Sequence, residues 1–129
     1  PDSTVIISVM GTKNIIKIIN KKNIDNLICQ SNKNIYELRK NVCKLGYFII
    51  DEEIIFEDKY YIIIKFKKGL KKYTENELLL GPILSFKKNE TYIKYLNELK
   101  NNIEKNINKY DENKLQRQLQ ILSIIKKEL

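Results

Sequence analysis

Tyr73-Thr-Glu-Asn-Glu-Leu-Leu-Leu-Gly-Pro-Ile-Leu84 is the stretch that divides the chain into two kinds of structure. Its three consecutive leucines suit a helical turn, and they run directly into Gly81 and Pro82. Glycine commonly ends a helix, and a proline just beyond it keeps that helix from resuming. We therefore expect a short capped helix here and a sharp turn of the chain before Asn89.

Before this corner, strands and helices alternate. Residues 5–9 and 26–29 are short apolar runs, typical of strands that are buried on both faces of a parallel sheet. Apolar residues at helical spacing follow each run, over residues 13–22 and 34–45. The connections are long enough for parallel pairing, so this part reads as β-α-β-α.

The pattern then becomes that of an antiparallel hairpin. Residues 47–56 and 60–66 are strand-like runs on either side of a short polar turn. After the corner, apolar residues recur every three or four positions, with one polar interruption at residues 111–113. This spacing predicts two amphipathic helices packed as an antiparallel, coiled-coil hairpin. We accordingly divide the chain into an α/β domain, residues 1–85, and a helical tail, residues 86–129.

The order β-α-β-α followed by a β-hairpin predicts an α/β fold, and it matches the second half of a Rossmann-like class I methyltransferase sheet. The first half of such a sheet carries a glycine-rich turn and an acidic residue for the cofactor. The four glycines of this chain are far apart and form no such turn. The chain also opens on Pro1-Asp2 without an initiator Met, so we expect a fragment or a processed chain.

Composition narrows the chemistry. The net charge is +8 and the pI is about 9.4, which permits nucleic acid or an anionic membrane as partner but equally suits a solvated lysine-rich surface. With no histidine, a catalytic Ser-His-Asp or Cys-His triad cannot be built, and Cys29 and Cys43 alone make no ordinary zinc site. We expect both thiols to be core residues of a cytoplasmic protein that uses no metal and no membrane.

Several short motifs follow one another in a distinctive order. They are Met10-Gly11-Thr12 after the first strand, Leu27-Ile28-Cys29-Gln30-Ser31-Asn32, Leu38-Arg39, Gly46-Tyr47, and Glu77-Leu-Leu-Leu-Gly81-Pro82. In this order the chain resembles, over essentially its whole length, the bacterial tRNA adenine-N1 methyltransferases of the TrmK family. It departs from that pattern at Thr12, where the family has a second glycine, and at Ser31, where the family has proline.

The resemblance implies methylation of adenine 22 of tRNA at N1, with S-adenosylmethionine as the cofactor and tRNA as the partner. Such a transfer depends on placing the two reactants in line more than on acid or base strength. The resemblance implies a cofactor site at Val9, Met10 and Gly11 and a substrate pocket at Gln30, Ser31 and Asn32. From their positive charge alone, we expect Arg39, Lys100, Lys105 and Arg117 to contact RNA phosphates.

Structural roles for the same residues remain open. Met10-Gly11 also suits an ordinary turn, Ser31 or Asn32 suits the cap of the following helix, and a lone Arg39 suits a solvated helix face. The acidic residues 51–53 read as a solvated face, and the tail could serve only stability or self-association. The alternative to the enzyme is a non-catalytic RNA- or protein-binding α/β module with a helical docking hairpin.

Overall fold

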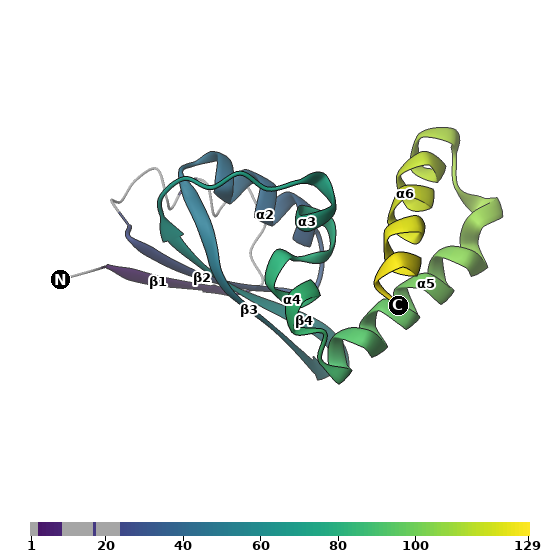
Figure 1. Cartoon of the computed structure of the whole chain (residues 1–129), viewed down its shortest axis with the longest axis horizontal. Helices are drawn as coiled ribbons and strands as arrows, with labels where there is room; N and C mark the ends of the chain where they lie inside the picture. The colour runs from purple at the N-terminus through teal and green to yellow at the C-terminus, as the bar shows by residue number, and fades with distance from the viewer. Residues whose placement is uncertain (1–2, 9–16, 18–23) are drawn as a thin grey trace.

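A mixed sheet of four strands forms the centre of the computed structural model, which describes residues 3–8, 17 and 24–129 (Figure 1). The strands are β1 (Thr4–Ser8), β2 (Asn26–Ser31), β3 (Tyr47–Glu57) and β4 (Lys59–Lys68), in the order β1-β2-β4-β3. β1 and β2 are parallel, whereas β4 is antiparallel to both β2 and β3. The predicted α/β fold, a parallel pair followed by an antiparallel hairpin, is confirmed.

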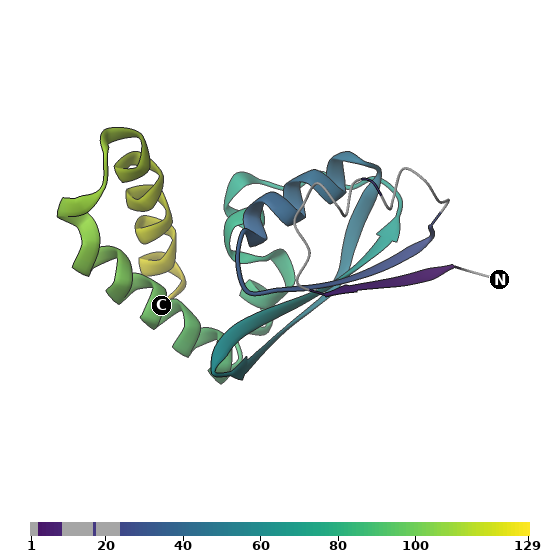
Figure 2. The same cartoon turned by 180° about the vertical axis from the view of Figure 1, so that it is seen from behind.

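The described helices are α2 (Ile35–Lys44), α3 (Glu75–Leu80), α4 (Pro82–Lys87), α5 (Glu90–Asn106) and α6 (Glu112–Glu128). A short 3-10 turn, Ile107–Lys109, follows α5. In Figure 1 and in the reverse view of Figure 2, α2 lies along the sheet, while α5 and α6 project from one end of it. The helix expected over residues 13–22 lies outside the described residues, apart from Lys17.

The corner at Gly81 joins two helices. Thr74 and Glu77 form a reciprocal capping box at the start of α3, and Gly81, at a φ of 95°, ends it. The short capped helix is confirmed, but we did not expect the second helix, α4, which begins at Pro82. Proline suits the first position of a helix, where its fixed φ fits and its missing N–H is not needed.

One continuous core connects the sheet with the helical hairpin. It includes Leu27, Ile64 and Phe66 from the sheet, and it continues through Tyr92 of α5 to Ile125 of α6. Each such side chain, when fully buried, contributes about 1.5–3 kcal/mol relative to an exposed one. The hairpin is therefore held on the body by shared apolar packing, and the division expected after residue 85 falls within α4.

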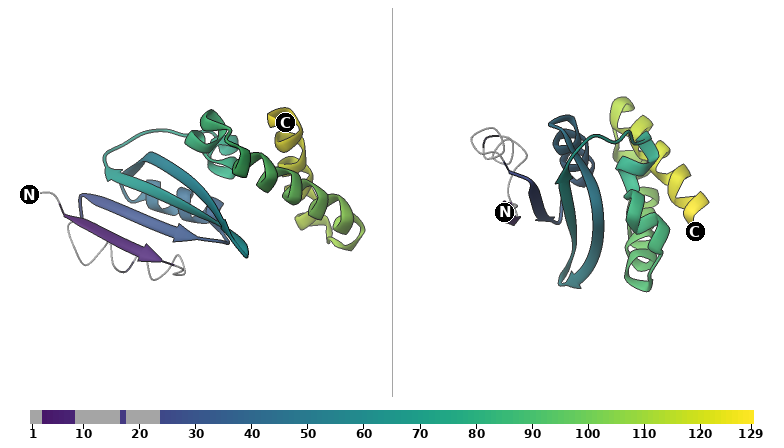
Figure 3. Two further views of the ribbon diagram at one scale, coloured as in Figure 1. Left: turned by 90° about the horizontal axis from the view of Figure 1, so that it is seen from below. Right: turned by 60° about the vertical axis from the view of Figure 1, so that its left-hand side comes forward.

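The inner face of α6 differs from the expected one. The spacing of apolar residues predicts an inner face of Leu115, Leu119, Leu122 and Ile125. Leu122 and Ile125 are buried, but Leu119 is 44% exposed and Ile124 is buried in its place. α6 contacts α3 as well as α5, so its apolar face is shared between two neighbours. Figure 3 shows the resulting arrangement, with the helical hairpin standing beside the sheet body.

Candidate functional site

The register of the parallel strands places the end of β1 beside one of the two predicted pocket segments. Ser8, the last residue of β1, pairs with Gln30 near the end of β2. Val9, Met10 and Gly11 lie outside the described residues, but they follow Ser8 directly in the chain. Ligands of open α/β sheets bind outside the carboxyl ends of the strands, which is the edge where β1 and β2 both end.

The segment after β2 forms a tight turn. The Ser31 hydroxyl donates to the carbonyl of Lys33 at 2.9 Å and accepts from the Lys33 N–H at 3.3 Å. The cap of α2 is Asn34, at a φ of 56° and with no side-chain cap hydrogen bond, so the expectation of a Ser31 or Asn32 cap was wrong. The half-buried side chain of Asn32 is thus free of the capping role.

A cavity of about 290 Å³ lies between this turn and the helical hairpin. It is bounded by the start of α2, the end of α3 and the facing sides of α5 and α6. Its described lining combines polar groups at Asn32 and Gln118 with an apolar floor at Leu79, Leu99 and Ile121. Both the sheet body and the helical hairpin therefore line this cavity, which lies near the edge where the parallel strands end.

A stack of an arginine on a tyrosine stands at this cavity. The guanidinium carbon of Arg117 lies 4.7 Å from the ring centroid of Tyr36, and both residues line the cavity. Glu75 joins them: its Oε1 accepts from the Tyr36 hydroxyl at 2.7 Å and from Arg117 Nη1 at 3.0 Å. These hydrogen bonds lower the pKa of Glu75, and the bond to Glu75 raises the pKa of Arg117.

Arg39, expected to contact RNA, is buried instead. Its side chain is 1% exposed, and its Nε donates to Glu52 Oε2 at 2.7 Å. Its Nη1 donates to the carbonyl of Leu78 at 3.0 Å, near the end of α3. This corrects both the expected phosphate contact and the alternative of a solvated helix face, because the guanidinium lies inside the fold.

Of the acidic residues 51–53, which we expected on a solvated face, Glu53 is exposed and Asp51 half-buried, but Glu52 lies inside the fold. A β-bulge between Ile49 and Asp51 shifts the alternation of β3, so that Glu52 points inward and is fully buried. Its Oε1 accepts from the N–H groups of Ile83 and Leu84 at the start of α4. Lys87 pairs with Asp51 at 2.9 Å, and the hydrogen bond lowers the pKa of Asp51.

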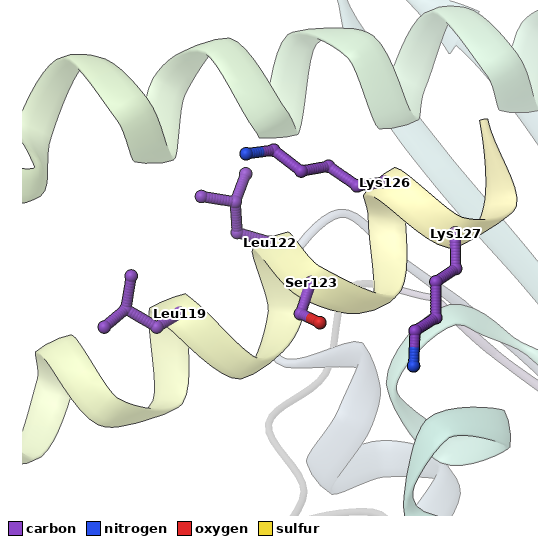
Figure 4. A pocket seen from close by; sticks show the side chains of 5 residues that line it. All are labelled: Leu119, Leu122, Ser123, Lys126 and Lys127. Atoms are coloured by element: carbon purple, nitrogen blue, oxygen red, sulfur yellow. The ribbon is translucent and has the colours of Figure 1, made fainter.

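The predicted cations of the tail occupy different surroundings. Lys105 is exposed and Lys100 half-buried on α5, whereas Arg117 belongs to the cavity. A second, shallow hollow lies on α6, lined by Leu119, Leu122, Ser123, Lys126 and Lys127 (Figure 4). Figure 4 shows both leucines pointing toward α5 and Lys127 turned away from them. Apart from Ser123, this hollow offers leucine and lysine side chains only, so it is the less specific of the two.

The described residues carry no nucleophilic or metal-type centre. Burial raises the pKa of Cys29 to about 12 and that of Cys43 to about 11, so both thiols stay protonated at neutral pH. Within the described ranges, no three His, Cys, Asp or Glu side chains are grouped so that they could hold a metal ion. No helix in these ranges is long and apolar enough to cross a membrane.

Sequence reasoning did not identify Tyr36 or Tyr95, which line the cavity, or Glu75, which binds Tyr36 and Arg117 beside it. A signal existed for Tyr36: it lies off the apolar stripe of α2, one turn before Lys40, whose ammonium donates to its hydroxyl at 3.2 Å. Glu75 and Tyr95 gave no such signal, because α3 and α5 approach α2 only through the tertiary fold. Both were assigned simply to a helical pattern.

The chain matches a known protein family and several solved structures. The family model for TrmK, tRNA (adenine(22)-N(1))-methyltransferase, matches residues 1–128. A protein of the NADB-Rossmann superfamily from Streptococcus agalactiae shares 24% identity with a TM-score of 0.86, covering 98% of this chain and 60% of its own. A Streptococcus pneumoniae protein in complex with S-adenosyl-L-methionine shares 24% identity with a TM-score of 0.84, covering 98% and 60%.

A third structure is that of M. capricolum TrmK in complex with S-adenosyl-homocysteine. It shares 28% identity with a TM-score of 0.78, and the match covers 97% of this chain and 58% of that one. The chain thus spans about 60% of the length of the solved structures that it matches. No curated protein sequence matches it.

Proposed function

Because the chain belongs to the TrmK family of tRNA (adenine(22)-N(1))-methyltransferases, we propose that the protein methylates adenine 22 of tRNA at N1. In this proposal the chain supplies the second half of the catalytic domain and the helical tail. S-adenosylmethionine is the methyl donor, tRNA is the partner, and the cytoplasm is where the two meet.

The pairing of Ser8 with Gln30 is the observation that carries this proposal. It supports a donor turn at Val9, Met10 and Gly11 directly beside a base-binding segment at Gln30, Ser31 and Asn32. Transfer from a sulfonium to a ring nitrogen requires the two reactants in line and close together. Two adjacent strand ends meet that requirement, since each contributes one of the two subsites.

The fit of the donor rests on the first strand. β1 lies at the edge of the described sheet, so further strands of a Rossmann-like sheet can pair beside it. Ile6 of β1 is 71% exposed, so one face of this strand is also open to further covering elements. We propose that the donor lies at the carboxyl end of β1, where Gly11 allows close approach of the backbone. The donor supplies the methyl group, and the residues of this chain orient the acceptor base.

The substrate side is proposed from side chains that can hydrogen-bond. The amides of Gln30 and Asn32 suit an adenine edge. Lys100 and Lys105 suit phosphates, whereas Arg117 is held on Tyr36 at the cavity, and Arg39 is left out because it is buried. Self-association through the tail remains a proposal, supported by the leucine-lined hollow on α6.

Nucleoside analysis tests the proposal directly. The full-length protein, incubated with S-adenosylmethionine and unmodified tRNA, should yield 1-methyladenosine at position 22 by mass spectrometry. Gly11→Val should abolish this product while leaving the circular-dichroism spectrum unchanged, because a β-branched side chain blocks the approach of the backbone. Tight tRNA binding without any methyl transfer would support the non-catalytic binding module instead.

A further inference from the structure

We propose that the cavity between α2 and α6 receives one unstacked nucleobase of the RNA, with Tyr36 and Arg117 as its stacking platform. This inference rests on the proposed function, because it takes the partner to be RNA. It adds a nucleotide-binding site that is formed jointly by the sheet body and the helical tail.

The size and floor of the cavity suit a base. Its volume of about 290 Å³ is at the lower end of the range of small-ligand pockets, about 300–1,000 Å³. Leu79, Leu99 and Ile121 supply apolar surface from three different helices. Such a floor buries the flat face of an aromatic ring, and polar groups line the cavity on α6 and on the turn after β2.

One wall of the cavity is a stack of Arg117 on Tyr36 that is already assembled. Glu75 holds both residues through hydrogen bonds of 2.7 and 3.0 Å. Lys40 donates to the Tyr36 hydroxyl at 3.2 Å, and its ammonium lies 5.4 Å from the centroid of the same ring. Unstacked bases bind to proteins by stacking on aromatic rings and on arginine planes, and a platform that is already ordered loses little entropy on binding.

Polar groups stand where the edge and the phosphate of a nucleotide would lie. Gln118 of α6 lines the cavity, and its carboxamide both donates and accepts, as a base edge requires. No side chain caps the first turn of α2, so the backbone N–H groups of that turn can donate hydrogen bonds to a phosphate oxygen. Together with the net charge of +8, these groups favour a nucleotide over a neutral apolar ligand.

Filter binding of tRNA to the full-length protein tests the inference, with unpaired nucleotides replaced one at a time by an abasic ribose. Tyr36→Ala should weaken binding of unmodified tRNA about 10-fold, the scale of one lost base–aromatic stack. The dependence on salt should not change, because no phosphate contact is removed. One abasic position should weaken the wild-type protein by a similar factor, and Tyr36→Ala should cause no further loss on that RNA.

Two further variants control for folding and for charge. Ile121→Trp fills the cavity from α6 and should reproduce the loss and its coupling to the same abasic position. Lys105→Gln, on the exposed side of α5, should flatten the salt dependence and weaken all the RNAs alike. Thermal unfolding followed by circular dichroism identifies any variant that does not fold.

The inference is overturned if folded Tyr36→Ala and Ile121→Trp bind tRNA like the wild type. It is also overturned if their losses are the same on every abasic RNA, because no base would then occupy the cavity. In both cases the wild-type protein would still methylate tRNA, so the proposed function would stand. A wild-type protein that neither binds nor methylates tRNA would refute the proposed function itself.

Discussion

The only two arginines of the chain each pair with a glutamate, but in opposite surroundings. Arg39 and Glu52 are 1% and 0% exposed and lie 2.7 Å apart in the body of the fold. Arg117 and Glu75 are 39% and 44% exposed and lie 3.0 Å apart beside the cavity. The two ion pairs thus have similar distances but differ greatly in their exposure to water.

That difference decides what each pair can do. A buried ion cannot return to water when its partner is lost, so the pair of Arg39 and Glu52 stays fixed and holds α2, β3 and the corner after α3 together. An exposed ion exchanges its partner at little cost. Arg117 can therefore leave Glu75 for another anion or keep it, whereas Arg39 has no such freedom.

The largest effect should follow from breaking the buried pair. Glu52→Gln leaves the charge of Arg39 buried without compensation, and we expect the free energy of unfolding to fall by about 3–5 kcal/mol. Urea denaturation of the full-length protein measures this loss. Glu57→Gln, an exposed change on the same strand, is the matched control and should stay within about 0.5 kcal/mol. Equal losses for the two variants would show that burial of the pair has no special cost.

A second effect should arise at the glycine that the buried pair crowds. A Cβ on Gly81 would lie 2.6 Å from Arg39 Nη2 and 2.6 Å from Glu52 Oε1, whereas a Cβ on Gly46 would meet nothing within 4 Å. Both glycines have a positive φ, 95° and 97°. Gly46→Ala should therefore cost about 1–2 kcal/mol from backbone strain alone, and Gly81→Ala about 3 kcal/mol or more. Thermal denaturation of the two variants under the same conditions measures both losses, and their difference is the cost of the steric overlap at position 81.

A third and smaller effect should appear at alkaline pH, where the buried hydroxyl of Tyr92 ionises. Burial raises the pKa of Tyr92 to about 12, above the ordinary tyrosine value of about 10. The folded-state pKa is raised, so the contribution to stability is complete below pH 10 and is lost as the pH rises toward 12. Between pH 9 and 11, the unfolding free energy of the wild type should fall more steeply than that of Tyr92→Phe. Parallel curves would mean that Tyr92 ionises as freely in the folded state as in the unfolded one.

The exposed pair should give the smallest change. Arg117→Gln should alter the free energy of unfolding by less than about 1 kcal/mol. The pKa of Glu75 is lowered, so any stabilisation by this carboxylate is present above about pH 4.3 and is lost as the pH falls below it. The difference in unfolding free energy between the wild type and Arg117→Gln should thus be smaller at pH 3 than at pH 7, as denaturation curves at the two pH values would show. A loss as large as that of Glu52→Gln would make the two pairs equivalent.

The sequence of strands and helices along the chain could be predicted, because local hydrophobic patterns determine it. Residues 5–9 and 26–29 have the continuous apolar character of buried parallel strands, and the turn around Asp58 separates two strand-like runs. The pair of Arg39 and Glu52 could not be predicted, because the bulge after Ile49 reverses which residues of β3 point inward. Without that bulge Glu52 would have faced outward with its neighbours at even positions.

Only part of the cavity could be predicted from the sequence, for a related reason. Asn32 stands at a strand end, where a polar residue indicates a site, and the structure places it at the cavity. Tyr36, Glu75 and Arg117 come from three helices whose mutual approach depends on the corner at Gly81. No local pattern encodes a contact between residues 36 and 117, so this part of the site follows from packing alone.

The crowding at Gly81 also limits how this corner can change over evolutionary time. A side chain at position 81 requires a smaller neighbour than Arg39, but losing Arg39 alone leaves Glu52 charged and buried. Each single step thus passes through a less stable protein, whereas exchanging both ions for apolar residues avoids a buried charge. We therefore expect positions 39, 52 and 81 to vary together among related sequences, as one inherited unit.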